Sequence, residues 1–197
     1  MTNVVAKAVN RRAFVSELLG RLPDALVVSG LGASSYDLFA AGDRGTNYYL
    51  WGAMGASTSL ALGLALAQPD KSVLVLTGDG EQLMGIGSLG TVAVKQPPNL
   101  TIVVLDNGHF GETGMQRSHT SLGTDLVAVA KGFGIADSFA VDRLSMCQTI
   151  AEKARARAGT TFVRVAIEAV DMPRCLPPRD GAYVKNRFRA ALGLHPF

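Results

Sequence analysis

Residues 72–85 read SVLVLTGDGEQLMG, and this stretch says more about the fold than any other part of the chain. The apolar run ends directly at Gly78-Asp79-Gly80, so a single carboxylate lies between two glycines where a buried strand is expected to stop. Such a tripeptide is usually a plain turn. It can also form a site for a metal-bound phosphate, because glycine lets the backbone approach an anion closely. Other segments have to decide between the two readings.

Strand-like and helix-like segments alternate along the chain. Continuous apolar runs predict strands, and helices are expected between them, the first with Asn10 as its N-cap. The predicted strands are 25–30, 47–51, 72–77, 100–106, 139–141 and 160–169. The predicted helices are 10–22, 34–41, 56–67, 81–96, 124–134, 144–158 and 185–193. Unbroken apolar strands are typical of a parallel sheet covered on both faces. The sequence therefore predicts one α/β domain over residues 1–197, a three-layer structure with a mostly parallel sheet and an irregular tail from about residue 170.

The amino-acid composition indicates how this domain is packed and in which compartment it is expected. The 197 residues are 48% hydrophobic and include 22 glycines, which fits either a large core or a large subunit interface. Cys147 and Cys175 show no ligand spacing and no disulfide framework, so we expect a reducing, cytoplasmic compartment. The longest apolar run, 60–67, is too short to span a membrane, and no secretory leader is recognisable.

The net charge of +3 is unevenly distributed, with basic residues in excess after residue 152. A basic tail can suit nucleic acid, but this one lacks interleaved aromatic residues and any known nucleic-acid module. A solvated face or a subunit contact is the favoured interpretation, and no nucleic-acid partner is expected.

A second strand end carries the matching polar residues. Asp106-Asn107-Gly108-His109 follows the apolar run 100–106, and 26 residues separate Gly80 from Asn107. That interval fits one helix and one strand, which would bring Asp79 and Asn107 to the same edge of the sheet, where ligands bind in open parallel sheets. Carboxylate, amide and backbone carbonyl oxygens are ligands that Mg²⁺ or Ca²⁺ prefers when it binds a diphosphate.

This GDG-x26-N spacing resembles the metal–diphosphate motif of thiamine diphosphate enzymes. SGLGASSYDLF (29–39) resembles the first diphosphate-contacting turn of that family, and WGAMGASTSLALGLALA (51–67) is similar to the segment whose bulky residue lies under the cofactor. The resemblance covers roughly residues 10–170. It implies thiamine diphosphate with Mg²⁺ or Ca²⁺ as the cofactors.

The resemblance also implies roles for matching residues. Asp79, the Asn107 side chain and the backbone carbonyl of His109 would bind the metal, and Met54 would hold the cofactor in its bent conformation. The full set expected at the cofactor is Gly32, Ala33, Ser34, Met54, Gly78, Asp79, Gly80, Glu81, Asn107, His109 and Gly111. One departure is Asp106, where many family members have asparagine; the metal ligand is the following residue.

Two further residues are candidates for catalysis beside Met54. Glu112 lies five positions after Asn107 and could relay protons, or it could simply cap a helix start. His119 lies in a polar loop that could face the substrate, or it could be an ordinary loop histidine.

Family members bind the cofactor between two domains, and this chain resembles only the diphosphate-binding one. The resemblance implies a separate α subunit that carries the pyrimidine-binding domain and its activating glutamate, in an α2β2 or higher hetero-oligomer. DNGHFGETGMQRSHT (106–120) and the tail are most similar to the β subunit of sulfopyruvate and phosphonopyruvate decarboxylases. The implied activity is a carboxy-lyase reaction, the non-oxidative decarboxylation of a 2-oxo acid to an aldehyde, active only with the partner subunit.

Four alternatives remain open at this point. The chain could be half of a carboligase similar to acetolactate synthase, or a catalytically silent scaffold subunit that binds the cofactor. A ferredoxin-linked oxidoreductase subunit would usually carry cluster cysteines, which two isolated cysteines do not provide. A flavodoxin-like or dinucleotide-binding module is the structural alternative, but the dinucleotide-binding pattern would need a third glycine in GLGASS (30–35).

Overall fold

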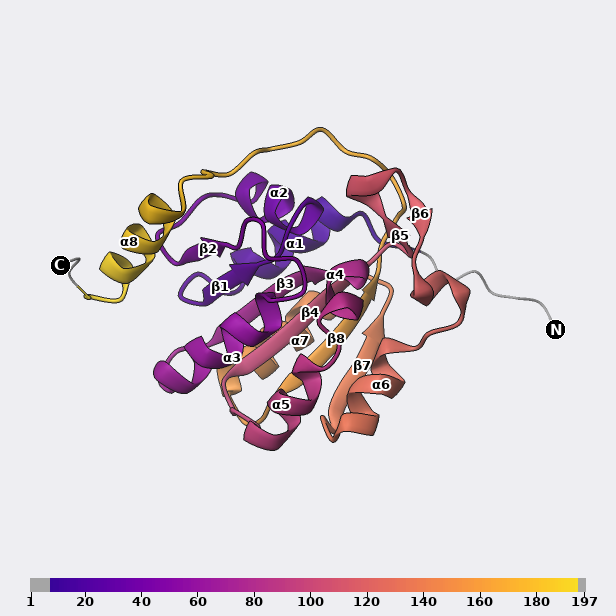
Figure 1. The fold of residues 1–197 in the computed structure, drawn as a ribbon. Helices are drawn as coiled ribbons and strands as arrows, with labels where there is room; N and C mark the ends of the chain where they lie inside the picture. The colour runs from indigo at the N-terminus through magenta and orange to yellow at the C-terminus, as the bar shows by residue number, and fades with distance from the viewer. Residues whose placement is uncertain (1–7, 195–197) are drawn as a thin grey trace.

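The computed structural model describes residues 8–194, and its centre is a six-stranded parallel sheet with the strand order β2-β1-β3-β4-β8-β7. Figure 1 shows this sheet with helices on both sides. The six strands are β1 (Leu26–Ser29), β2 (Asn47–Tyr49), β3 (Val73–Gly78), β4 (Leu100–Asp106), β7 (Asp137–Val141) and β8 (Thr161–Ala166). Every strand predicted from the sequence is present, so the prediction of a parallel, doubly covered sheet is confirmed.

Eight α-helices surround the sheet within the described residues. They are α1 (Arg11–Gly20), α2 (Ala33–Ala40), α3 (Ser57–Ala67), α4 (Asp79–Met84), α5 (Ser88–Lys95), α6 (Leu126–Phe133), α7 (Met146–Ala156) and α8 (Gly181–Ala191). A small antiparallel hairpin of β5 (His109–Phe110) and β6 (Gln116–Arg117) follows β4, with the short 3₁₀ helices η1 (Gly111–Thr113) and η2 (His119–Leu122) beside it. Asn10 caps α1 as predicted, because its Oδ1 accepts a hydrogen bond from Ala13 N at 3.0 Å.

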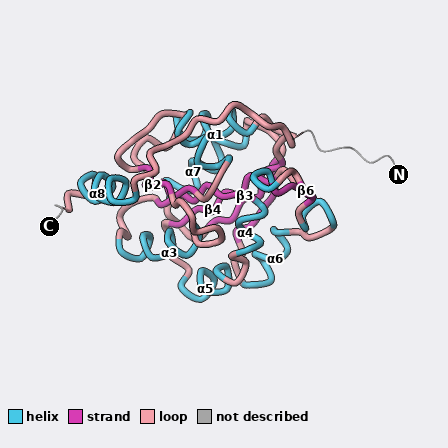
Figure 2. Tube along the Cα trace, turned by 45° about the horizontal axis from the view of Figure 1, so that its top comes forward, coloured by secondary structure: helices cyan, strands magenta, loops and turns pink. Residues whose placement is uncertain are grey.

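The helices divide into two layers, which Figure 2 shows above and below the strands. One hydrophobic core lies between the sheet and α1, α2 and α7, and the other lies between the sheet and α3, α5 and α6. Successive side chains of β3 pack into opposite cores. Leu74 and Leu76 belong to the first core, and Val73 and Val75 belong to the second. All seven residues of β4 are buried, as expected for a central strand with both faces covered.

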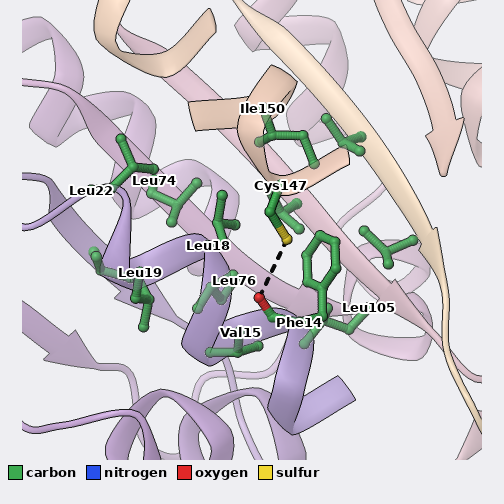
Figure 3. Close-up of a cluster of buried hydrophobic side chains, with 14 of the residues drawn as sticks. Phe14, Val15, Leu18, Leu19, Leu22, Leu74, Leu76, Leu105, Cys147 and Ile150 are labelled. Atoms are coloured by element: carbon green, nitrogen blue, oxygen red, sulfur yellow. Dashed lines mark hydrogen bonds between the residues drawn. The ribbon is translucent and has the colours of Figure 1, made fainter. Parts of the chain in front are cut away.

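Figure 3 shows the first core, where Phe14 and Leu18 of α1 meet Cys147 and Ile150 of α7. The Cys147 thiol donates to the Phe14 carbonyl oxygen at 3.7 Å, and burial raises the pKa of this thiol to about 11. Both cysteines are free, in agreement with the prediction that they form no disulfide. Cys147 therefore acts as a packing residue rather than a reactive one.

The prediction of a single helix over 81–96 is wrong. The structure has two helices there, α4 and α5, separated by a turn at Gly85–Gly87. The turn brings the backbone of Gly85 against that of Gly55, and a Cβ on Gly85 would lie only 2.0 Å from the Gly55 carbonyl oxygen. Glycine is thus required here for a close backbone contact, a need that helical periodicity does not reveal.

The segment 168–180 contains no helix or strand and connects β8 to α8, which begins at Gly181 rather than at the predicted residue 185. We call it the crossing segment. In Figure 1 it arches in orange and yellow over α2 at the upper edge of the molecule. Arg12 Nη2 donates to the Pro173 carbonyl oxygen at 2.8 Å, and Trp51 Nε1 donates to the Pro178 carbonyl oxygen at 2.9 Å. Between residues 8 and 194, no helix combines the length and the apolar character needed to cross a membrane.

Candidate functional site

A cavity of about 170 Å³ lies where β1, β3 and β4 end, at the carboxyl edge of the sheet. The strand register pairs Gly78 with Leu105, so Asp79 and Asp106 leave the sheet at the same level. Most residues predicted for the site line this cavity, namely Ala33, Ser34, Met54, Gly78, Asp79, Gly80, Glu81, Asn107, His109, Gly111 and Glu112. Segments from four different parts of the chain are therefore brought together as the sequence spacing indicated.

Two predicted residues do not line the cavity. Gly32 lies between the lining residues Leu31 and Ala33, and its positive φ of 75° is one that glycine adopts without strain. A Cβ on Gly32 would lie 2.9 Å from the Glu112 side chain, so the turn and Glu112 are close neighbours. His119 begins η2, and its ring instead packs edge-on against the ring of Phe110 at 6.4 Å.

Asp79 is buried, with 2% of its surface exposed, at the first position of α4. Its Oδ2 accepts a hydrogen bond from the Ser118 hydroxyl group, and Thr120 Oγ1 lies 3.2 Å from the same oxygen. Burial raises the pKa of the Asp79 carboxyl group, the Ser118 hydrogen bond lowers it, and the charge of Asp106 raises it further. An ionised carboxylate in this position is costly unless a cation accompanies it.

Asp106 anchors the loop that carries Asn107. Its Oδ1 accepts from Gly108 N at 2.9 Å and from Thr120 Oγ1 at 2.8 Å, and its Oδ2 accepts from Arg164 Nε at 2.6 Å. Asp106 thus satisfies its oxygens within the protein, in keeping with the expectation that the departure from asparagine leaves the ligand role to Asn107.

Asn107 and His109 are fixed by a tight local turn. Asn107 Oδ1 accepts from His109 N at 2.9 Å, and the His109 ring nitrogen Nδ1 lies 2.7 Å from the Asn107 carbonyl oxygen. The His109 ring is therefore engaged by its own loop, and the ligand role of the His109 carbonyl stays a prediction. Asp79, Asn107 and His109 all line the cavity at this edge of the sheet.

Glu81 was expected at the cofactor, and the structure adds a feature of its side chain that sequence reasoning missed. The carboxylate is buried, and its Oε2 accepts from Leu31 N at 3.1 Å. Burial raises the pKa of the Glu81 carboxyl group, while hydrogen bonds from the hydroxyls of Ser57 and Thr77 lower it. A Cβ on Gly30 would lie 1.4 Å from Oε2, so the absence of a side chain at residue 30 makes room for this carboxylate. Glu81 thereby connects the turn after β1 to the start of α4.

The sequence pattern of one protein family matches residues 31–165, and its description is "Thiamine pyrophosphate enzyme, C-terminal TPP binding domain". The chain belongs to this thiamine pyrophosphate enzyme family. The match contains the turn after β1, the Met54 loop, the GDG tripeptide and Asn107, so the resemblance recognised in the sequence is confirmed.

Curated relatives within the thiamine pyrophosphate enzymes carry two kinds of name. The sulfopyruvate decarboxylase subunit beta of Methanococcus maripaludis is 35% identical over 153 residues, which cover 78% of this chain and 81% of that protein. The phosphonopyruvate decarboxylase of Streptomyces viridochromogenes is 40% identical over 192 residues, which cover 94% of this chain but 47% of that protein. The chain thus spans about half the length of this second relative. It matches 58% of the length of the Methanocaldococcus jannaschii sulfopyruvate decarboxylase subunit beta, at 44% identity over 110 residues.

Solved structures agree on the architecture of this thiamine pyrophosphate enzyme domain. The benzoylformate decarboxylase of Polynucleobacter necessarius superimposes with a TM-score of 0.71 at 22% identity, over 88% of this chain and 36% of that chain. At this level of identity the likeness shows the fold alone.

Several cavity residues escaped the sequence analysis. Tyr36, Phe110, Arg11 and Arg174 all line the cavity, and Ser118 and Thr120 bind Asp79 from the loop after β6. The hydroxyl pair in SHT (118–120) was the available signal, because polar residues soon after Asn107 are close enough in sequence to fold back onto the end of β3. Arg174 gave no local signal, since it lies in a segment without regular structure.

The contact between Gly85 and Gly55 makes a testable prediction about the Met54 loop. Gly85→Ala should displace this loop and lower the free energy of unfolding by about 1–3 kcal/mol, because a backbone oxygen cannot move aside as a side chain can. Thermal or urea unfolding measures the effect. Gly63→Ala is the matched control, since a Cβ there meets nothing within 4 Å inside helix α3 and should be neutral or slightly stabilising. Equal effects of the two substitutions would contradict the prediction.

The raised carboxyl pKa values predict how the stability of the cofactor-free chain depends on pH. The folded-state pKa values of Asp79, Glu81 and Asp37 lie above their ordinary values because burial disfavours the charged forms. The stability that each group contributes is complete below its unfolded pKa, near 4, and is lost as the pH rises through the folded value. Asp79→Asn should therefore be stabilised relative to wild type by an amount that grows as the pH rises from about 4 towards neutral.

Urea unfolding of both proteins across that pH range, without cofactor or metal, measures this difference. Asp142→Asn is a suitable control, because Asp142 is an exposed partner of Arg143. A difference between Asp79→Asn and wild type that stays constant or shrinks with rising pH would be incompatible with a raised pKa at Asp79.

Proposed function

We propose that this chain is the diphosphate-binding subunit of a two-subunit thiamine diphosphate enzyme, which decarboxylates a 2-oxo acid to an aldehyde without oxidation. The observation that carries the proposal is that Asp79, Asn107 and His109 all line one cavity in a TPP-binding domain. Relatives named as sulfopyruvate and phosphonopyruvate decarboxylases support the reaction class.

The donor set fits a divalent cation that arrives with a diphosphate. Within residues 8–194 there is no cluster of three or more His, Cys, Asp or Glu side chains able to hold an ion. One carboxylate, one amide and one carbonyl leave coordination positions for phosphate oxygens and water, which suits Mg²⁺ and also Ca²⁺. The raised pKa of the buried Asp79 supports the same view, since a bound cation would offset the cost of its charge.

The two glycines flanking Asp79 fit the same cofactor in different ways. A Cβ on Gly80 would lie 2.5 Å from the Phe110 ring, whereas a Cβ on Gly78 would meet nothing within 4 Å. Gly80 therefore allows the β5–β6 hairpin to close over α4, and Gly78 leaves open space on the cavity side. Gly32, Ala33 and Ser34 would approach the diphosphate from the turn after β1.

When bound, thiamine diphosphate supplies the electron sink that stabilises the charge left by departing carbon dioxide. The residues of this chain would position that group and exclude water from it. Met54, Met115 and Phe110 provide an apolar wall of the cavity, and Met54 would hold the bent cofactor. Glu112 is the cavity carboxylate best placed to move a proton, because its side chain is 36% exposed and lies beside the turn at Gly32.

A separate subunit would supply the pyrimidine-binding half of the site. The domain described here contains the diphosphate half, and the relatives named as beta subunits support a partner on a separate chain. We propose an α subunit that carries the activating glutamate, assembled as α2β2 or a higher hetero-oligomer. The exposed position of Met54, 38% accessible in the isolated chain, is consistent with a partner that covers the cavity.

The test is purification of the tagged chain from its native host, followed by mass spectrometry and an activity screen. We expect a partner protein, bound thiamine diphosphate with a divalent metal, and aldehyde formation from at least one of pyruvate, 2-oxobutanoate, 3-sulfopyruvate and 3-phosphonopyruvate. A hydroxyketone product would assign a carboligase instead. Cofactor binding in the assembled complex without any turnover would favour a silent scaffold subunit.

A further inference from the structure

The cavity contains two arginines that the proposed function does not use, and they differ in accessibility. Among the described residues that line it, the arginines are Arg11 and Arg174, and no lysine is present. Arg11 is buried and lies 3.3 Å from the fully buried Asp37, a carboxylate that Arg12 also contacts, so Arg11 is held below the surface in an ion pair. Arg174 differs, because its side chain is 55% exposed and its carboxylate contact is looser, 3.5 Å from Nη2 to Glu112 Oε2. Arg174 is therefore the accessible arginine of the cavity.

The crossing segment holds Arg174 in place at the rim. Its neighbour Pro173 accepts a hydrogen bond from Arg12 Nη2 at 2.8 Å, and Arg12 Nε donates to Asp37 at 3.1 Å. The Arg174 guanidinium also lies over the Tyr36 ring, 5.9 Å from its centre. A guanidinium stacked on an aromatic ring keeps its planar edge free for a second ligand. The Arg174 side chain is thus oriented, and its guanidinium group can still bind a second ligand.

Arg174 lies at the rim, whereas the proposed metal site lies at the floor of the cavity. Asp79 is 2% exposed and Arg174 is about half exposed, so the two groups are at different depths. Of the cavity residues nearest to Arg174 in sequence, Val170 and Met172 are apolar and Asp171 is acidic. An anion that contacts Arg174 there would be partly removed from water, which strengthens a charge-assisted bidentate contact.

We propose that Arg174 is the specificity-determining residue that binds a second anionic group at the far end of the 2-oxo acid. This inference rests on the proposed function. The chemistry of the reaction argues that the departing carboxylate is not the ligand of Arg174. Decarboxylation moves negative charge away from that carboxylate, so a cation bound to it would stabilise the ground state more than the transition state. A sulfonate, phosphonate or carboxylate at the distal carbon keeps its charge throughout and loses nothing by such contact.

Glu112 is the residue that the substrate anion would replace beside Arg174 in this proposal. Without substrate it faces Arg174, and its charge raises the pKa of the nearby Tyr36 hydroxyl after the larger effect of burial. An incoming anion would compete with Glu112 for the guanidinium, at the loose distance seen here. Because the contact is longer than a hydrogen bond, little would be lost by the exchange.

The test uses the assembled complex with thiamine diphosphate and Mg²⁺, and compares 3-sulfopyruvate, which has a distal anion, with 2-oxobutanoate, which has none. Arg174→Gln should lower kcat/KM for 3-sulfopyruvate at least ~10-fold more than for 2-oxobutanoate, mainly through KM, as for the loss of a charged hydrogen bond. The cofactor Kd, measured by titration of the same variant, should stay within about 2-fold. Arg143→Gln, which breaks an exposed pair with Asp142 at 2.9 Å, is the matched control and should leave the substrate ratio unchanged.

Arg174→Lys keeps the charge but loses the planar fork, so it should show the same selective loss to a smaller degree. This second variant keeps the test decisive if Arg174→Gln does not assemble. Equal losses for both substrates, or a wild-type complex that prefers 2-oxobutanoate, would overturn the role of Arg174 and leave the proposed function standing. A raised cofactor Kd without a substrate effect would make Arg174 a diphosphate ligand instead. A wild-type complex that decarboxylates no 2-oxo acid would overturn both proposals.

Discussion

Asp79→Asn is expected to abolish metal-dependent binding of thiamine diphosphate while the chain stays folded. The substitution keeps the shape of the side chain and removes the negative charge that would bind the cation. The affinity for thiamine diphosphate with Mg²⁺ should fall by at least ~100-fold, equivalent to about 2.7 kcal/mol. The same variant should be more stable than wild type without cofactor at neutral pH, because a buried charge with a raised pKa has been removed.

Calorimetric titration of the assembled complex measures the affinity, and thermal unfolding measures the stability. Asp142→Asn provides a control, since it removes an exposed carboxylate with no place in the cavity. The opposite signs of the two effects make the result specific, because a merely structural aspartate would lose stability and cofactor affinity together. Undiminished affinity for the cofactor would refute the metal site at Asp79.

Met54→Ala is expected to reduce turnover much more than cofactor affinity. Met54 lines the cavity and is 38% exposed in the isolated chain, so its removal leaves no hole in either hydrophobic core. If Met54 holds the cofactor in its bent conformation, its loss would misplace the reacting groups, and kcat should fall about 10- to 100-fold. The Kd for thiamine diphosphate should change by less than about 3-fold, since the diphosphate contacts supply most of the binding.

Steady-state kinetics of the complex, together with cofactor titration, separate the two effects. Met84→Ala is the matched control, because Met84 is 69% exposed and does not line the cavity. A parallel loss of kcat and cofactor affinity in Met54→Ala would mean that Met54 simply contributes binding surface.

The sequence predicted the sheet well because its central strands are mostly apolar runs. Covering both faces of β3 and β4 favours apolar residues at successive positions, and that preference is visible without any tertiary information. The break between α4 and α5 was not predictable in the same way. Glycines at 85 and 87 are tolerated in many helices, and only the approach of Gly55 from a distant loop turns Gly85 into a necessity.

The residues of the site also differ in whether they could be predicted from the sequence. Asp79 and Asn107 could be found because each directly follows a strand, so the sheet itself places them side by side. Arg174 could not be found, since its position depends on the path of the crossing segment, which the contacts of Arg12 and Trp51 determine. The burial of the Glu81 side chain depends equally on a distant glycine, Gly30.

The contact between α8 and β2 has a consequence for the solution behaviour of the protein. Strand β2 is an edge strand, and α8 packs beside it, with Phe188 meeting the Tyr48 ring edge-on at 5.6 Å and Arg187 Nη2 donating to the Asn47 carbonyl oxygen at 3.1 Å. An uncovered edge strand can recruit a strand from another molecule and begin aggregation. Helix α8 therefore covers the edge strand of the sheet. It also anchors the C-terminal end of the crossing segment, which carries Arg174. Helix α8 thus contributes both to protection from aggregation and to the shape of the cavity rim.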